Sequence, residues 1–157
     1  MDRAQRSINH VLVRLFNEIL AIEERALSSG EFSDASVREM HVLEAADAEH
    51  EENSMSAIAA RLGITVGSLT VAVTTLERKG YLRRERATDD KRVVRVQLTE
   101  RGRQANARHA AFHAEMVAAV QKTLTAEQLD VLTEALDHII VFFEQYEPAR
   151  DLPAGSD

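Results

Sequence analysis

The sequence contains no cysteine and no tryptophan, and only two prolines occur among its 157 residues. Without cysteine the chain can form no disulfide, no thiol-based redox sensor, no thiolate zinc site and no cysteine nucleophile. Aromatic residues are also scarce, at 4%, while alanine and leucine recur, which favours helices over a β-sandwich or barrel. No apolar run approaches about 18 residues, and the first residues lack the apolar core of a signal peptide. We therefore expect one compact, mainly α-helical domain in the cytoplasm, without a membrane segment.

Acidic residues outnumber basic ones, and the chain carries a formal net charge of −7. Positive charge is nevertheless concentrated between Arg78 and Arg108, where eleven lysines and arginines accompany four acids and give a net charge of +7. Because Coulomb interactions in water act within a Debye length of about 10 Å, a local basic patch can bind phosphates even on an acidic protein. The distribution indicates a nucleic-acid surface, although a solvated basic face would have the same composition.

Two helices are predicted in the first third of the chain. Hydrophobic residues at intervals of three and four indicate a long amphipathic helix over residues 6–27. Ser36 and Glu39 have the spacing of a capping box, which predicts a second helix that ends near Ala48.

Two shorter helical segments follow, and a glycine ends each of them. Ser54 or Ser56 can cap the first, which ends at Gly63, and Thr65 can cap the second, which ends at Gly80. Two short helices joined by a tight turn are typical of a helix-turn-helix, whose second helix reads DNA. We expect this second helix to bury Val66, Leu69, Val73 and Leu76.

A β-hairpin is predicted behind the helix-turn-helix. Residues 81–86 and 92–98 are short segments separated by a polar turn, and the second is rich in β-branched residues. Such a hairpin with a basic tip is a wing. Thr99 can cap a further helix that extends to about Lys122. The last helix is expected to begin at another capping box, formed by Thr125 and Gln128.

The helices at the two ends of the chain, in residues 1–30 and 123–147, carry apolar stripes without an obvious core of their own. We expect them to pack against the same helices of a second copy and to form a homodimer. Residues 31–122 would then form the winged helix-turn-helix with its connecting helix, and residues 148–157 a disordered tail. A two-fold dimer would place its reading helices about 34 Å apart, which matches successive major grooves of palindromic double-stranded DNA.

Three short motifs follow one another from the reading helix to the helix after the wing. An LExxGxL motif at the end of the reading helix contains Leu76, Glu77, Gly80 and Leu82. A DxR motif at the wing tip contains Asp90 and Arg92, and an LTxxG motif at the start of the next helix contains Leu98, Thr99 and Gly102. With these motifs the segment over residues 69–102 resembles the MarR family of bacterial transcriptional regulators. The resemblance extends over about residues 8–145.

The resemblance implies that Arg92 enters the minor groove of DNA and that Asp90 orients its guanidinium. It also implies phosphate contacts from Arg84, Arg86 and Lys91. Narrow A·T-rich minor grooves concentrate negative potential and favour arginine. On the reading helix, exposed hydroxyls suit phosphate and base-edge contacts, and a glycine allows close approach of the backbone. We expect these roles for Gly67, Ser68, Thr70, Thr74 and Thr75, although solvent exposure alone would account for each hydroxyl.

Three further segments, residues 17–24, 34–41 and 108–117, resemble the fatty-acid-synthesis repressors within this family. That resemblance implies a repressor that uses acylated acyl carrier protein as its corepressor. Zinc, or an aromatic phenolic compound, is the alternative effector within the same family.

Histidines form a possible metal site. His109 and His113 are four residues apart and share one helical face, and His41 lies on the inner side of the second helix. With a carboxylate from Glu23 or Glu24 they form a plausible zinc set, and the spacing is similar to that of zinc-responsive regulators in this family. The same histidines could instead be hydrogen-bonded at a helix junction or line a tunnel for an acyl chain. We therefore expect no required cofactor, with zinc as a possibility.

An enzyme is not expected, because the sequence lacks a zinc-protease HExxH motif, a nucleophile elbow and a phosphate-binding glycine loop. A sensor that has lost DNA binding is also disfavoured, since it would have no use for the concentrated positive charge of the wing. The expected function is a homodimeric DNA-binding repressor.

Overall fold

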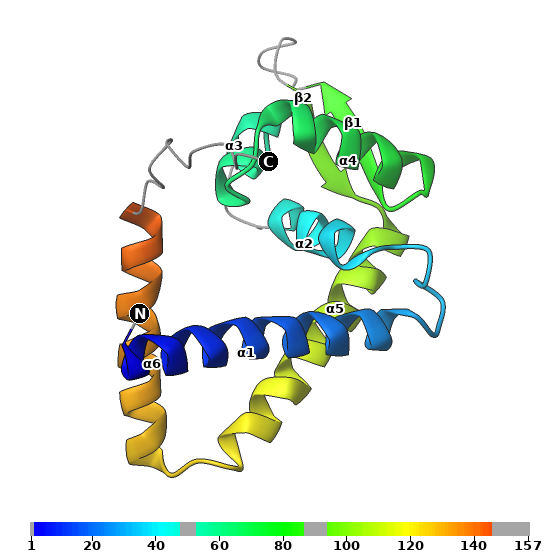
Figure 1. Ribbon diagram of the computed structural model, residues 1–157. Helices are drawn as coiled ribbons and strands as arrows, with labels where there is room; N and C mark the ends of the chain where they lie inside the picture. The colour runs from blue at the N-terminus through cyan, green and yellow to red at the C-terminus, as the bar shows by residue number, and fades with distance from the viewer. Residues whose placement is uncertain (1, 48–52, 87–93, 146–157) are drawn as a thin grey trace, which may run out of the picture. The chain divides into compact units, whose positions relative to one another are not determined.

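The computed structural model describes residues 2–47, 53–86 and 94–145. Within these ranges the fold is mainly α-helical, as predicted, with one antiparallel sheet of two strands. The chain forms two compact units, Met1–His113 and Ala114–Asp157, and the boundary between them falls within the fifth helix. The elements, labelled in Figure 1, are α1 (Arg3–Leu27), α2 (Val37–Ala46), α3 (Met55–Arg61), α4 (Val66–Arg78), β1 (Leu82–Arg86), β2 (Val94–Leu98), α5 (Glu100–Gln121) and α6 (Ala126–Gln145).

Side-chain caps start the helices close to the predicted positions. The Ser36 hydroxyl accepts from the backbone N–H of Glu39, whose carboxylate accepts from the N–H of Ser36, so the capping box at α2 is confirmed. Ser54, rather than Ser56, caps α3, and Thr65 caps α4. The reciprocal bonds between Thr125 and Gln128 confirm the capping box before α6.

Two helix boundaries differ from the sequence prediction. The first helix begins at Arg3, because Asp2 forms a capping box with Gln5 that the hydrophobic pattern does not reveal. The second helix ends at Ala46 instead of near residue 48, because the backbone leaves helical geometry at Asp47. The Asn53 side chain donates to the Ala46 carbonyl at 2.8 Å. Positive φ angles follow α3 and α4 as expected, at Gly63 and Gly80.

The core of the first unit lies among α2, α3, α4, the sheet and the start of α5 (Figure 1). On α4, Leu69, Val73 and Leu76 are fully buried, as predicted. Val66 was expected among them but is 45% exposed. It opens the helix and lies about 60° around it from Leu69, at the edge of the buried stripe.

The predicted wing is confirmed for the part that the structure describes. Strand β1 pairs with β2 in antiparallel register, from Leu82 opposite Leu98 to Arg86 opposite Val94. Leu82 and Leu98 are buried, so one end of the hairpin belongs to the core. The wing tip, with Asp90, Lys91 and Arg92, lies outside the described residues.

A tight junction joins the reading helix, the wing and α5. The Thr99 hydroxyl donates to the Gly80 carbonyl at 2.6 Å, and the Thr99 N–H donates to the Tyr81 carbonyl at 2.9 Å. A Cβ atom on Gly102 would lie 2.1 Å from that Tyr81 oxygen, so only glycine fits at this position. These contacts give the threonine and the glycine of the LTxxG motif their structural roles in this chain.

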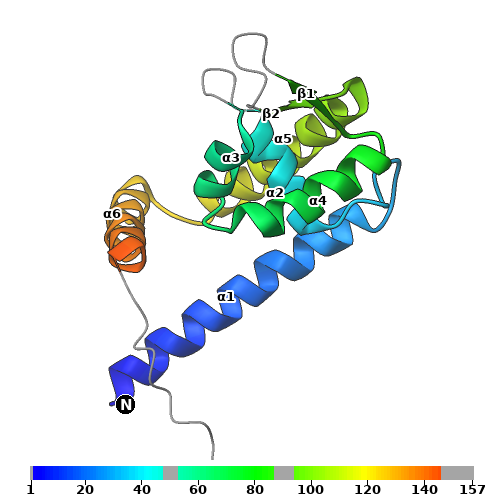
Figure 2. The same cartoon turned by 90° about the horizontal axis from the view of Figure 1, so that it is seen from above.

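Two long helices expose apolar faces. Figure 2 shows α1 extending beyond the group formed by α2, α3 and α4. Large exposed apolar side chains on α1 include Ile8, Val11, Leu15 and Phe16, and those on α6 include Leu132, Leu136, Ile140 and Phe143. Among the described residues no single helix is long and apolar enough to cross a membrane, and α3 and α4 satisfy that measure only as a pair bent by 105°.

Candidate functional site

The outward face of α4 is the first candidate surface for DNA. Gly67, Ser68, Thr70 and Thr74 are exposed, as the sequence suggested, whereas Thr75 is half-buried. The residues of α4 that pack into the core lie on the opposite side of the helix, so this face is open to solvent except where the Arg84 side chain of β1 contacts it. The arrangement fits a helix that enters a groove of DNA.

The hydroxyls on this face are already engaged within the helix. Thr70 Oγ1 donates to the Val66 carbonyl at 2.7 Å, and Thr74 Oγ1 donates to the Thr70 carbonyl at 2.7 Å. Thr75 Oγ1 donates to the Val71 carbonyl at 3.1 Å in the same way. Each hydroxyl proton is therefore bound to the backbone, so the oxygen can act only as an acceptor, and that of Thr74 already accepts from Arg84 Nη2. Phosphate oxygens need donors, so these threonines suit phosphate contacts less well than we expected from the sequence.

Val71 is a surface residue that sequence reasoning missed. Its side chain is 69% exposed. Its outward orientation could have been predicted from the sequence, because Val71 lies two residues after Leu69 and two before Val73. Both of these neighbours are buried, and a helix turns by about 200° over two residues.

Arg84 binds the reading helix in this structure. Its Nη1 lies 2.8 Å from Oε2 of Glu77, and its Nη2 donates to Thr74 Oγ1 at 2.9 Å and to the Thr70 carbonyl at 3.2 Å. Arg86, at the end of β1, is exposed. Of the five wing residues assigned to DNA, the structure thus places Arg84 on α4 and leaves Arg86 open to solvent, while the other three lie outside the described residues.

The end of α4 is tied to the segment before α2 by a second polar network. The Tyr81 hydroxyl donates to the carboxylate of Asp34, and the Arg101 guanidinium lies 4.4 Å from the centre of the Tyr81 ring. Lys79 forms an ion pair with Glu39 at 2.8 Å. Burial, followed by the hydrogen bond to Asp34, raises the pKa of Tyr81 to about 12. These contacts hold the end of α4 against the start of α2.

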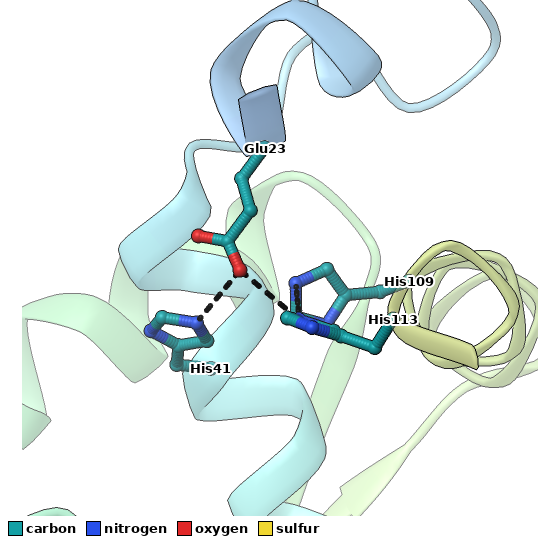
Figure 3. A group of neighbouring side chains, drawn as sticks. All are labelled: Glu23, His41, His109 and His113. Carbon is teal, nitrogen blue, oxygen red and sulfur yellow. Dashed lines mark hydrogen bonds and ion pairs between the residues drawn. The ribbon is translucent and has the colours of Figure 1, made fainter. Parts of the chain in front are cut away.

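The histidines identified in the sequence do converge. Figure 3 shows Glu23 of α1, His41 of α2, and His109 and His113 of α5 facing one another. One potential ligand atom from each of the four lies within 4.8 Å of the others. The carboxylate comes from Glu23, which is 3% exposed, whereas Glu24 is exposed and takes no part in the group.

Distances within this cluster, named here the Glu23 cluster, are close to those around a metal ion. His113 Nε2 lies 3.1 Å from Glu23 Oε1 and 3.1 Å from His109 Nε2, and His41 Nε2 lies 4.0 Å from Glu23 Oε1. Ligand atoms about 2.05 Å from a tetrahedral zinc ion are about 3.3 Å apart, so small side-chain movements would suffice. Three imidazoles and a carboxylate are donors that zinc accepts.

The electrostatics of the Glu23 cluster favour a neutral imidazole at His109. Burial lowers the pKa of His109, and the neighbouring His113 and His41 lower it further, whereas Glu44 opposes the shift. A neutral imidazole can act as a metal ligand, while a protonated one cannot. The side chain of His41 is 42% exposed, which leaves a route from solvent to the cluster.

The chain is similar to known proteins in both sequence and fold. The model of the MarR family matches residues 36–94. The structure is similar to that of Streptococcus pneumoniae FabT in complex with DNA, with 33% identity, a TM-score of 0.85, and coverage of 91% of this chain and 99% of that one.

Two further proteins similar to this chain are also transcriptional regulators or bind DNA. The transcriptional repressor YetL of Bacillus subtilis is 25% identical over 146 residues, which are 93% of this chain and 78% of that protein. The fold is also that of Staphylococcus aureus MepR in a DNA complex, with 18% identity, a TM-score of 0.74, and coverage of 86% and 95% of the two chains. The chain therefore belongs to the MarR family, and it is a DNA-binding transcriptional regulator with a winged helix-turn-helix.

Proposed function

We propose that the protein is a homodimeric repressor of fatty-acid-synthesis genes that responds to acylated acyl carrier protein. The observation that carries this proposal is the similarity to DNA-bound FabT over 91% of the chain. It is supported by residues 17–24, 34–41 and 108–117, which resemble fatty-acid-synthesis repressors of the family.

Dimerisation is assigned to residues 1–30 and 123–147. The exposed apolar side chains of α1 and of α6 support this assignment, because such faces are stable in water when a second surface covers them. A two-fold dimer would present two copies of α4 to a palindromic operator. Sedimentation of the full chain is expected to give twice the monomer mass of 17.5 kDa, and a monomer at micromolar concentration would contradict the assignment.

DNA binding is assigned to residues 31–122. In this assignment α4 enters the major groove, Arg92 of the wing enters the minor groove with Asp90 orienting it, and Lys91 and Arg86 contact phosphates. The net charge of +7 between Arg78 and Arg108 supports a phosphate-binding surface. Arg92→Ala is expected to weaken operator binding and to reduce its salt dependence, and unchanged values of both would contradict the assignment.

The effector is tested by fluorescence anisotropy with a palindrome from a fatty-acid-synthesis promoter. The titration is made in a metal chelator with long-chain acylated carrier protein, and unacylated carrier protein serves as the control. Tighter operator binding with the acylated form alone is the expected result. An equal effect of the two forms would exclude the acyl chain as the signal.

A second candidate function is zinc-responsive regulation, and the Glu23 cluster favours it. Glu23, His41, His109 and His113 would hold the ion, which would pull together α1, α2 and the middle of α5. Because α2 is joined to the end of α4 through the ion pair of Glu39 with Lys79, such a movement would reach the reading helix.

Zinc binding is measured by competition with a chromophoric chelator. Glu23→Gln is expected to lower the zinc affinity by about tenfold or more, as is His113→Gln. Glu24→Gln is a matched control, because Glu24 is the exposed neighbour of Glu23 and lies outside the cluster, and it should leave the affinity unchanged. Equal effects of Glu23→Gln and Glu24→Gln would rule out this arrangement of ligands.

A further inference from the structure

The outward face of α4 has an apolar side chain near its centre. Val71 is 69% exposed, whereas Leu69 and Val73 are fully buried. Since two residues turn a helix by about 200°, Val71 points away from the core. It also lies in the N-terminal half of α4, the part of a recognition helix that contacts base edges.

Packing inside the described part of the chain gives valine little burial at this position, because Val71 lies at the open rim of a groove with Leu62 and Ile64 and stays 69% exposed. Valine is a poorer helix former than alanine, because its branched Cβ restricts χ1 in a helix. At a site this exposed, little burial offsets that loss. A residue that departs from local preference without a gain in packing points to a role in function.

The neighbouring side chains leave carbon surface on the same face. Thr70 and Thr74 lie on one side of Val71 on the exposed face of α4, and each hydroxyl donates to a helix carbonyl at 2.7 Å. With their protons bound to the backbone, these hydroxyls offer DNA no donor. What remains available on this face for specific contact includes the aliphatic parts of three β-branched residues.

We propose that Val71 of α4 reads the 5-methyl group of thymine in the major groove. Thymine is the base that presents a methyl group there, beside its O4 acceptor, so an apolar contact distinguishes it from the other three bases. The proposal rests on the DNA-binding function of the family. It does not depend on the effector or on the genes that are regulated.

The test removes the methyl group from the DNA and the valine from the protein. An operator is first selected from a random-sequence library with the full-length protein, and each thymine is then replaced in turn by deoxyuridine, which lacks only the 5-methyl group. For the wild-type protein, replacement at a contacted position is expected to weaken binding about fourfold, the value for one buried methyl group. For Val71→Ala, the same replacement is expected to have no effect.

Matched variants control for indirect effects. Val66→Ala removes another exposed valine of α4, which lies at the edge of the buried stripe, and it should keep the wild-type response to deoxyuridine. Val71→Thr keeps the shape of valine but replaces one methyl group by a hydroxyl, and it should give a reduced response. Thermal unfolding should show that Val71→Ala folds as well as the wild type, because the position is exposed and alanine favours a helix.

Two results would overturn the proposal. The first is a wild-type protein that is insensitive to every thymine-to-deoxyuridine replacement while it binds the selected operator. The second is an equal response of wild type and Val71→Ala at every sensitive thymine. Failure of the library to yield any bound sequence would overturn the DNA-binding function itself, and that outcome is distinct from both.

Discussion

Arg84 and Glu77 form an ion pair, with 2.8 Å between Nη1 and Oε2, that joins strand β1 of the wing to helix α4. The backbone N–H of Arg84 donates to the same carboxylate, at 3.2 Å from Oε1. An arginine with this many acceptors inside the protein holds the wing against the helix. We infer that it acts on DNA through the position of α4, whereas the family resemblance implies a direct phosphate contact.

The salt dependence of DNA binding distinguishes these two roles. Each phosphate contact contributes about 0.9 to the slope of log K against log salt concentration, because binding releases counterions. Arg84→Gln is expected to weaken operator binding without changing this slope. Arg86→Gln is the matched variant on the same strand, and because Arg86 is exposed we expect the slope to decrease in magnitude by about 0.9.

Measuring operator binding at several salt concentrations for the wild type and both variants decides between the positioning role of Arg84 and a direct phosphate contact. A slope for Arg84→Gln that falls as much as that for Arg86→Gln would establish a phosphate contact and refute the positioning role. Glu77→Gln adds an independent check. If Arg84 acts through its ion pair, this variant should weaken binding like Arg84→Gln, although glutamate itself repels phosphate.

Local rules predicted the fold well because they act within a few residues. The caps at Ser36, Thr65 and Thr125 and the left-handed glycines at Gly63 and Gly80 each require only a short segment of chain. The periodicity of α4 likewise placed its buried residues, except for Val66 at the first turn. Each of these features is determined by residues that are close to it in the sequence.

Side-chain partners across elements were not predictable in the same way. Glu23 and Glu24 are equivalent in sequence, and which one faces the histidines depends on how α1 packs on α2, since adjacent helical residues point about 100° apart. The pairing of Arg84 with Glu77 depends on the path of the wing. The orientation of the threonine hydroxyls on α4 is a choice between rotamers that sequence alone does not make.

The buried phenol of Tyr81 should titrate far above the usual range. Burial and the hydrogen bond to Asp34 raise its pKa from 10 to about 12. In the unfolded chain the phenol would lose its proton near pH 10 while the folded chain still holds it. The contribution of Tyr81 to stability is therefore present below about pH 10 and is lost as the pH rises towards 12.

Ultraviolet absorbance measures this ionisation directly. The chain has two tyrosines, so Tyr146→Phe leaves Tyr81 as the single phenol. Its midpoint is expected near 12, and it should fall when Asp34→Asn removes the negative charge beside the hydroxyl. A midpoint near 10 in the folded protein would show that the phenol is neither buried nor held by Asp34.

Gly102 should be intolerant of any side chain, because a Cβ atom there would lie 2.1 Å from the Tyr81 carbonyl oxygen and 3.1 Å from its carbonyl carbon. These are backbone atoms at the junction of α4, the wing and α5, and they cannot rotate away. Gly102→Ala is therefore expected to destabilise the fold by about 1–3 kcal/mol, the usual cost of overpacking, despite the better helix propensity of alanine.

Gly67→Ala is the matched control, since Gly67 is also helical and its added Cβ would meet only Thr65 Oγ1, at 3.8 Å. That substitution should stabilise the protein by up to about 1 kcal/mol. Denaturant unfolding of the two variants measures both changes, and a Gly102→Ala protein as stable as Gly67→Ala would refute the close contact at the LTxxG motif.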